Sequence, residues 1–288
     1  GNFTYCKNVD IEKTCKLGLA GITLQTNDSL ASIDIKMQNQ NQFHNYNFNT
    51  VKILHNNTKN YQLKVNNKLA YYVDSTSSEF LLNECSDSIH FEIKAKTKSS
   101  KNFSLYGFIL NNNLKGINYH TIGVNGATAK SYLKCELFSE QLKTLNPDWI
   151  IVSLGTNEAY NKNFDLTKFK KNYTELINKI KSTAPNAYIL LTTPGDHLKN
   201  KKYINKNIPI VCKSIANTAS EKNTGLWDFY TIMGGKNSIN KWYNNKLTAK
   251  DKIHLNKFGY DLKGKLLYYA FIKNFLSKSG KLTNQIKN

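Results

Sequence analysis

A chain of 288 residues is long enough to bury a sizeable core, and this length suggests one large or two medium domains. Lysine and arginine total 40 against 20 aspartate and glutamate, a formal charge of +20, so we expect an anionic partner. The lysines are spread along the whole chain without a nucleic-acid motif, which argues against nucleic acid and leaves an anionic polymer or surface.

The spacing of the cysteines and the hydropathy argue against further classes of protein. Five cysteines without a C-x-x-C spacing argue against a zinc site or a thioredoxin-type motif, and Cys6 and Cys15 are candidates for one disulfide. No stretch approaches the roughly 20 apolar residues of a membrane span. No signal peptide is visible, and the abrupt start indicates processing or truncation.

The first half of the chain has the pattern of an all-β unit. From about residue 17 to 116, short segments of alternating polarity are separated by turns rich in Asn, Asp and Ser, and six of them are 19–24, 31–37, 50–54, 61–65, 89–95 and 105–110. Period-2 segments at such regular spacing predict an antiparallel β-sandwich. Because this half contains no Ser/His/Asp grouping, it is more typical of a binding or packing module than of an enzyme.

Strand and helix patterns alternate in the second half. From His120 we expect a short strand, a turn containing glycine and a helix that continues to Leu145, before Asn146-Pro147. Further strands are expected over 149–153, 187–193 and 224–229, and further helices over 166–182, 207–217 and 256–276. This alternation predicts a doubly wound α/β domain, with the boundary near residues 112–118.

The stretch from Pro147 to Tyr160 combines a strand with polar residues at its end. The apolar run from Trp149 stops at Gly155, which predicts a strand buried on both faces in the middle of a parallel sheet. Asn157 follows at the carboxyl end, the edge where open α/β sheets place their ligand-handling loops. We therefore expect Asn157 to face a substrate, with an ordinary strand-to-loop turn as the alternative.

Two pairs of residues have the chemistry of an ester-hydrolysing site. Asp251 and His254 are three residues apart on one expected helical turn, so the carboxylate can accept a hydrogen bond from one imidazole nitrogen and leave the other as a base. Gly126 and Asn157 lie at the ends of two successive α/β units, and a backbone N–H and a side-chain amide are donors that stabilise an oxyanion. A surface ion pair and ordinary turns are the alternatives.

Three blocks in this order resemble a known family. Gly-Val-Asn-Gly-Ala-Thr from Gly123, Leu-Gly-Thr-Asn-Glu from Leu154 and Asp-Lys-Ile-His from Asp251 resemble the second, third and fifth blocks of the SGNH (GDSL-like) hydrolases. The resemblance implies a serine esterase of flavodoxin-like three-layer α/β/α fold that needs no metal or organic cofactor. It also implies that Gly126 and Asn157 are the oxyanion-hole donors, that His254 is the general base and that Asp251 orients it.

The nucleophile of that family is not found in this chain. Its serine lies in a Gly-Asp-Ser block after the first strand, and no Gly-Asp-Ser occurs here. Ser29, in Asn27-Asp28-Ser29, lies between β segments, and Ser153 is expected inside a buried strand, so neither is presented at a strand-to-helix turn. We therefore expect the serine upstream of residue 1, on a separate N-terminal segment that completes the sheet and covers an apolar slot.

A β-rich half placed ahead of the second block resembles the bacterial peptidoglycan O-acetylesterases. This implies a carbohydrate-binding-like β-sandwich insert over residues 1–115 and an SGNH domain lacking its first strand over 116–288. It also implies a periplasmic or cell-envelope location and removal of O-acetyl groups from an anionic acetylated polysaccharide. The alternatives are a noncatalytic carbohydrate-binding protein on a degenerate SGNH fold, and an SGNH esterase acting on acetylxylan or lipid.

Three further side chains are weaker candidates. His197 lies at the carboxyl end of an expected strand and is a candidate for substrate contact, although a surface histidine is the commoner case. Trp227 and Trp242 are candidates for lining a sugar site, although core packing is the commoner use of tryptophan.

Overall fold

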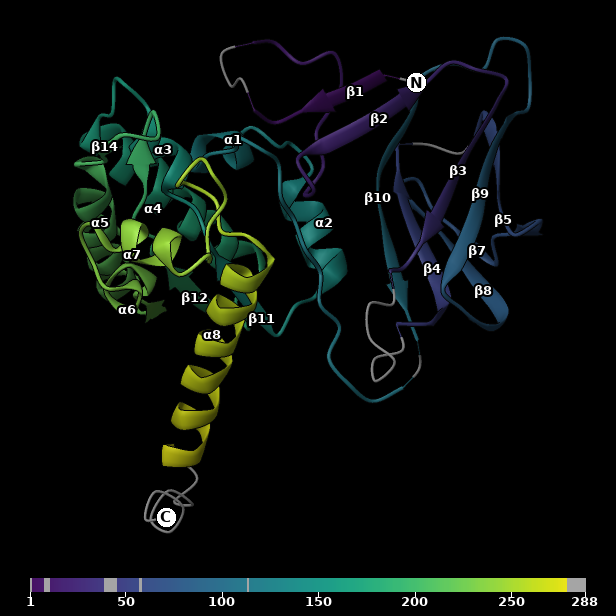
Figure 1. Ribbon diagram of the computed structural model, residues 1–288. Coiled ribbons are helices and arrows are strands. Elements are labelled where there is room, and N and C mark those ends of the chain that lie inside the picture. Colours follow the sequence, from purple (N-terminus) through teal and green to yellow (C-terminus); the bar gives the residue numbers. More distant parts are fainter. Residues whose placement is uncertain (1, 8–10, 39–45, 57–58, 113, 279–288) are drawn as a thin grey trace. The chain divides into compact units, whose positions relative to one another are not determined.

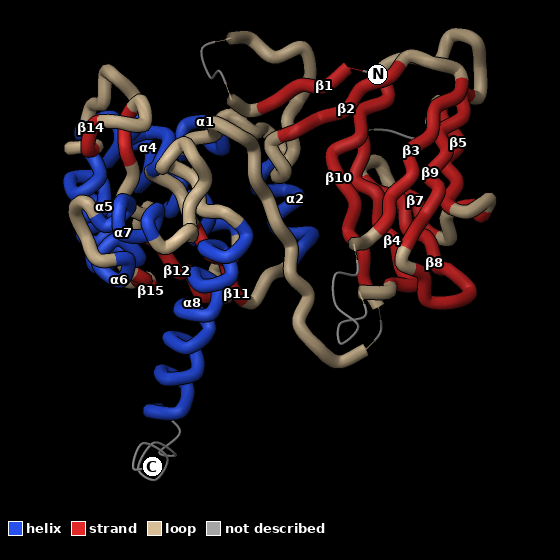
Figure 2. Tube along the Cα trace, in the orientation of Figure 1, coloured by secondary structure: helices blue, strands red, loops and turns tan. Residues whose placement is uncertain are grey.

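The computed structural model describes residues 2–7, 11–38, 46–56, 59–112 and 114–278 (Figures 1 and 2). The chain divides into two compact units. The first comprises Gly1–Asn146 with Lys179–Pro185, and the second Pro147–Asn178 with Asn186–Asn288. Each unit has an apolar core of its own.

The first unit contains two antiparallel sheets. The six-stranded sheet has the order β1 (Asn2–Tyr5), β2 (Ile22–Thr26), β10 (Phe103–Asn111), β4 (Phe48–His55), β8 (Ser77–Ser86) and β7 (Tyr72–Val73). The four-stranded sheet has the order β3 (Leu30–Lys36), β9 (Ser88–Ala95), β5 (Tyr61–Val65) and β6 (Lys68–Leu69). The predicted antiparallel β-sandwich is confirmed.

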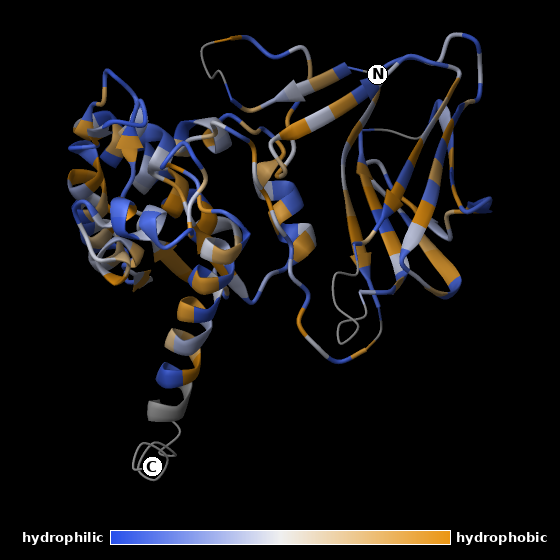
Figure 3. Ribbon diagram, in the orientation of Figure 1, coloured by the Kyte–Doolittle hydropathy of each residue, from blue (hydrophilic) through white to orange (hydrophobic). Residues whose placement is uncertain are grey.

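The alternation of the strands explains how the two sheets share one core. Tyr61, Leu63 and Val65 of β5 are buried, whereas the intervening Gln62 and Lys64 are partly exposed. Along β3 and β9, apolar and polar residues also alternate (Figure 3). Because successive side chains of a strand point to opposite faces, each sheet places one apolar face inward, and β4, β5, β8, β9 and β10 all contribute to the same cluster.

The second unit is built on a parallel sheet, as the sequence predicts. Its order is β11 (Trp149–Val152), β12 (Tyr188–Thr192) and β15 (Gly225–Trp227), with a small hairpin of β13 (Leu198–Lys199) and β14 (Tyr203–Ile204). The helices are α3 (Thr156–Tyr160), α4 (Leu166–Thr183), α5 (Asn207–Glu221), α6 (Phe229–Met233), α7 (Ser238–Asn244) and α8 (Lys257–Lys278). In the described part of the chain, no helix is long and apolar enough to cross a bilayer.

Strand β11 differs from the expectation in its burial. Trp149 is 53% exposed and Ile151 is 42% exposed, so the strand is not buried on both faces. Within the described residues β11 pairs with β12 alone, which makes it an edge strand rather than a central one. The indole of Trp149 stacks on Tyr188 and meets Phe271 of α8 edge-on.

The expected helix from the Gly turn to Leu145 is two helices, α1 (Ala129–Leu133) and α2 (Phe138–Leu145). The interruption has a tertiary cause, because the backbone N–H of Leu137 donates to the carbonyl of Leu17 at 3.1 Å. The short strand expected from His120 is absent, since the structure assigns no strand between residues 117 and 124.

The Cys6–Cys15 disulfide considered from the sequence is not formed. Cys6 and Cys135 are both fully buried, and their thiols are hydrogen-bonded to each other. This hydrogen bond lowers the pKa of Cys6. The buried thiol of Cys6 is therefore paired with Cys135, which is distant in the sequence, and not with Cys15.

The sandwich core provides a test of the fold. Phe91 of β9 is fully buried and meets Phe108 edge-on, with ring centroids 5.5 Å apart. We expect Phe91→Ala to lower the free energy of unfolding by about 3–5 kcal/mol, because it leaves a cavity between the sheets. Urea unfolding measures this change. Leu30→Ala on neighbouring β3, where Leu30 is 59% exposed, is the control and is expected to change it by about 0.5 kcal/mol or less. Equal losses in the two variants would contradict the assignment.

Candidate active site

The structure brings Asp251 and His254 together. Asp251 Oδ2 lies 2.7 Å from His254 Nδ1, and Asp251 Oδ1 accepts the backbone N–H groups of Ile253 at 2.9 Å and His254 at 3.0 Å. Among the described residues, no hydrogen bond involves His254 Nε2. The carboxylate therefore fixes one ring nitrogen and leaves the other for proton transfer.

The electrostatics of the pair keep the carboxylate charged. Partial burial acts to raise the pKa of Asp251, but the hydrogen bonds from the His254 ring and from the two backbone N–H groups outweigh it, so the pKa lies below its ordinary value. Asp251 is therefore ionised at neutral pH. An ionised partner favours the tautomer that carries its proton on Nδ1, which leaves a basic Nε2.

The backbone around this pair is a turn and not the helical turn that the sequence suggests. Helix α8 begins only at Lys257, and Lys252, inside the turn, has a left-handed φ of +53°. The turn is closed by a bridge between Thr248 and Leu255 and by the N–H of Ala249, which donates to the carbonyl of His254 at 2.8 Å. Turn closure, rather than helical periodicity, therefore sets the geometry of the pair.

Asn157 lies in the first turn of α3, immediately beyond the carboxyl end of β11, and is exposed. The N-cap of this helix is Gly155, whose φ is +116° and whose N–H donates to Glu158 Oε2 at 3.1 Å. A Cβ at Gly155 would lie 2.9 Å from Val211 Cγ1, so only glycine fits this turn. Gly155 and Glu158 thus fix where α3 starts.

Gly126 belongs to the first unit, whereas Asn157, Asp251 and His254 belong to the second. It lies in an exposed turn with φ of +80°, a conformation that favours glycine, and nothing lies within 4 Å of the position its Cβ would take. The turn leads into α1, which Thr128 caps by accepting the N–H of Ser131.

His197 is buried, so the expectation of a surface histidine is wrong. Only 1% of the residue is exposed, and its ring is held by the Gly195 carbonyl, 3.3 Å from Nδ1, and by the Asn205 amide nitrogen, 2.9 Å from Nε2. Burial lowers the pKa of His197 to about 4, and the nearby charge of His254 acts in the same direction. His197 is therefore neutral at physiological pH and is a structural neighbour of the Asp251–His254 turn.

The two tryptophans considered for a sugar site pack in the core of the second unit. Trp227 and Trp242 are 5% and 8% exposed, and both rings contact Phe229, at centroid distances of 5.2 and 5.7 Å. The indole N–H of Trp242 donates to the Met233 carbonyl at 3.0 Å. Core packing therefore accounts for both side chains.

The two serines considered from the sequence are both exposed. Ser153 lies just beyond the end of β11 and is exposed, so the expectation that it is inside a buried strand is wrong. Ser29 is exposed in the turn between β2 and β3 of the sandwich. The described residues also contain no cluster of three His, Cys, Asp or Glu side chains that could hold a metal ion.

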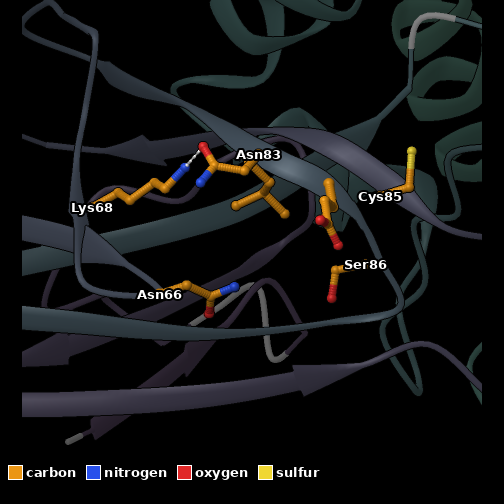
Figure 4. Close-up of a pocket in the computed structure, with 7 residues that line it drawn as sticks. Asn66, Lys68, Asn83, Cys85 and Ser86 are labelled. Atoms are coloured by element: carbon orange, nitrogen blue, oxygen red, sulfur yellow. Dashed lines mark hydrogen bonds between the residues drawn. The ribbon is translucent and has the colours of Figure 1, made fainter.

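The sandwich carries a hollow of about 360 Å³ (Figure 4). Polar side chains dominate its lining, and Lys68 donates a hydrogen bond to Asn83 across it. Glu84 and Ser86 of β8 also line the hollow, as does Asn66 from the turn between β5 and β6. Amide, hydroxyl and charged groups of this kind suit a polar ligand, and sequence reasoning did not identify them because no single motif contains them.

Comparison with known proteins gives one family match and several structural matches. A model of the GDSL-like Lipase/Acylhydrolase family matches residues 92–262. A solved structure of a peptidoglycan O-acetylesterase is similar over 96% of this chain and 76% of its own, with a TM-score of 0.79 and 21% identity, which shows the fold. A search of curated proteins found none that matches.

Two further solved structures match over about half of the chain. A lipase/acylhydrolase from Enterococcus faecalis is 23% identical, with a TM-score of 0.40 over 49% of this chain and 69% of its own. An acetyl xylan esterase is 24% identical, with a TM-score of 0.42 over 51% of this chain and 78% of its own.

The buried, neutral state of His197 predicts a pH dependence of stability. Its pKa falls from 6.5 to about 4 on folding, so the unfolded chain binds a proton below pH 6.5 that the folded chain does not bind until about pH 4. The stability from this residue is therefore present above pH 6.5 and is lost as the pH falls toward 4, by about 3 kcal/mol.

Urea unfolding of the wild type and of His197→Gln at pH 7.5 and pH 4 isolates this effect. The difference in unfolding free energy between the two proteins should shift by about 3 kcal/mol in favour of the variant at pH 4. His55, also buried with a pKa of about 4, is present in both proteins and cancels. A difference that stays constant with pH would show that His197 is not held neutral by the fold.

Proposed function

Because this chain belongs to the GDSL-like lipase/acylhydrolase family, we propose that it removes O-acetyl groups from a cell-wall polysaccharide, most specifically peptidoglycan. The predicted membership of the SGNH (GDSL-like) hydrolases is confirmed, and the protein is a carboxylic ester hydrolase. Its α/β fold with an added antiparallel sandwich, as the sequence predicts, matches a solved structure with a TM-score of 0.79. The observation that carries the proposed chemistry is the 2.7 Å hydrogen bond between Asp251 and His254.

In the proposed reaction, His254 is the general base. Its Nε2 takes the proton of a serine hydroxyl as the serine oxygen attacks the acetyl carbonyl, and Asp251 stabilises the imidazolium that forms. His254 then gives this proton to the sugar oxygen as its bond to the acetyl carbon breaks, so the sugar leaves with a free hydroxyl. A water molecule, deprotonated by the same nitrogen, attacks the acetyl-enzyme; acetate is released and the proton passes to the serine oxygen. We do not assign this serine to Ser29 or Ser153, because neither lies in a Gly-Asp-Ser block.

We assign the oxyanion to donors from Gly126 and Asn157. Asn157 is exposed at the start of a helix that follows the carboxyl end of a parallel strand, which is where α/β sheets bind ligands. Gly126 is exposed, and nothing lies within 4 Å of the position its Cβ would take, so its backbone is accessible. Each such donor typically contributes about 10²- to 10³-fold to the rate of acyl transfer.

The substrate class is supported by charge and by architecture. A formal charge of +20 suits an anionic acetylated polymer. We infer that the sandwich, residues 1–115 of the proposed insert, contacts that polymer at the hollow that contains Lys68 and Asn83. A periplasmic or cell-envelope location follows from such a substrate. The competing possibilities are an esterase acting on acetylxylan or lipid and a binding protein without catalysis.

Acetate release from O-acetylated peptidoglycan tests this function. The native protein should release acetate, and His254→Ala should lower kcat by about 10²- to 10⁴-fold because the general base is lost. The matched control is His90→Ala. His90 forms the same 2.7 Å contact with a carboxylate, Asp34, but lies in the sandwich, so kcat should not change.

The same assay separates the alternatives. Faster acetate release from acetylxylan than from peptidoglycan would replace the proposed substrate while keeping the chemistry. No acetate from any ester, with His254 intact, would favour a binding protein. A loss of activity in His90→Ala equal to that in His254→Ala would contradict the assignment of the base.

A further inference from the structure

Helix α3 carries the proposed oxyanion donor Asn157 but is only five residues long. A helix of this length is not stable by itself, because forming its first turn fixes several backbone dihedral angles and gains only one or two hydrogen bonds. Its orientation must come from the residues packed around it. The inference that follows rests on the proposed function, since it concerns how that donor is held.

Asn205 anchors the end of α3 from inside the second unit. The residue is 1% exposed, and its amide nitrogen donates one proton to the carbonyl of Ala159 at 3.1 Å and lies 2.9 Å from His197 Nε2. Its Oδ1 accepts the backbone N–H of Asn207 at 3.1 Å, and the Asn207 amide also donates to the Ala159 carbonyl, at 2.9 Å. Two side-chain amides therefore hold one carbonyl of α3, and all the hydrogen-bonding groups of the buried Asn205 amide are used.

His197 completes this arrangement as an acceptor. Its Nδ1 donates to the Gly195 carbonyl at 3.3 Å, so Nε2 carries the lone pair that the Asn205 amide needs. The ring also stacks on Tyr160, the last residue of α3, with centroids 6.1 Å apart. His197 thus contacts α3 directly through a ring and indirectly through Asn205.

The same segment is bonded to the turn that carries the general base. The backbone N–H of Leu198 donates to the carbonyl of Lys252 at 3.0 Å, and Lys252 lies between Asp251 and His254. His197 and Leu198 are adjacent, so two neighbouring residues connect to α3 and to the base turn. Helix α3 and the 251–254 turn are therefore both fixed to the buried segment of His197 and Leu198.

A role in folding alone does not require buried, fully hydrogen-bonded polar side chains such as His197 and Asn205. Burying polar side chains costs free energy unless every group is paired, and apolar residues would fill the same volume without that requirement. We propose that His197 and Asn205 are positioning residues, which hold α3 and the 251–254 turn so that Asn157 and His254 act on the same acyl group.

Two substitutions at His197 test the role. His197→Phe keeps an aromatic ring beside Tyr160 but removes the acceptor for Asn205, and we expect kcat for acetate release to fall by about 10- to 100-fold with KM changed by less than about twofold. His197→Gln places a carbonyl oxygen near the position of Nε2 and should keep kcat within about threefold of the wild type. Asn245→Ala, a surface amide at the end of α7, is the control and should leave both constants unchanged.

The outcomes separate this role from the proposed function. If the wild type releases no acetate, the proposed function fails first. If the wild type is active and His197→Phe keeps full kcat, or if His197→Gln loses as much kcat as His197→Phe, the positioning role is wrong. Should His197→Phe not fold, Asn205→Ser decides in its place: the same fall in kcat supports the role and an unchanged kcat overturns it.

Discussion

The hydrogen bond between Asp251 and His254 is the interaction on which the proposed chemistry depends, and it is made in a turn without a helical backbone to support it. Three backbone constraints replace that support: the closure of the turn at Thr248 and Leu255, the left-handed Lys252 inside it, and the bond from Leu198 outside it. The ionised carboxylate then needs no further partner, because two backbone N–H groups and the imidazole satisfy it.

The geometry of an Asp–His pair does not by itself make a base. Asp34 and His90 are equally close, at 2.7 Å, yet they are cross-strand neighbours on an exposed face of the sandwich. His254 differs in its surroundings. Its turn is bonded to the segment that contains the buried His197, and through Asn205 that segment reaches the helix of Asn157. Context within the fold, rather than the contact distance, distinguishes the two pairs.

The sequence predicts the periodic parts of this structure well, because regularly spaced apolar residues fall on one face of a strand or helix and that face is buried. The alternation in β5 and the spacing of Asp251 and His254 both survive in the structure, although a turn replaces the expected helix. Burial that depends on distant neighbours was not predictable. An apolar run does not reveal which elements cover the two faces of its strand, so the sequence places Trp149 inside although it is exposed. His197 was expected outside and is buried, since its partner Asn205 belongs to no motif.

Labelling with a fluorophosphonate probe, followed by mass mapping of the modified peptide, tests the central claim that His254 activates a serine nucleophile. The native protein should be modified at one serine, and His254→Ala should slow this modification by about 10²- to 10⁴-fold while His90→Ala leaves it unchanged. An enzymatically active wild type in which no serine is modified, or a His254→Ala variant that labels at the wild-type rate, would contradict the claim.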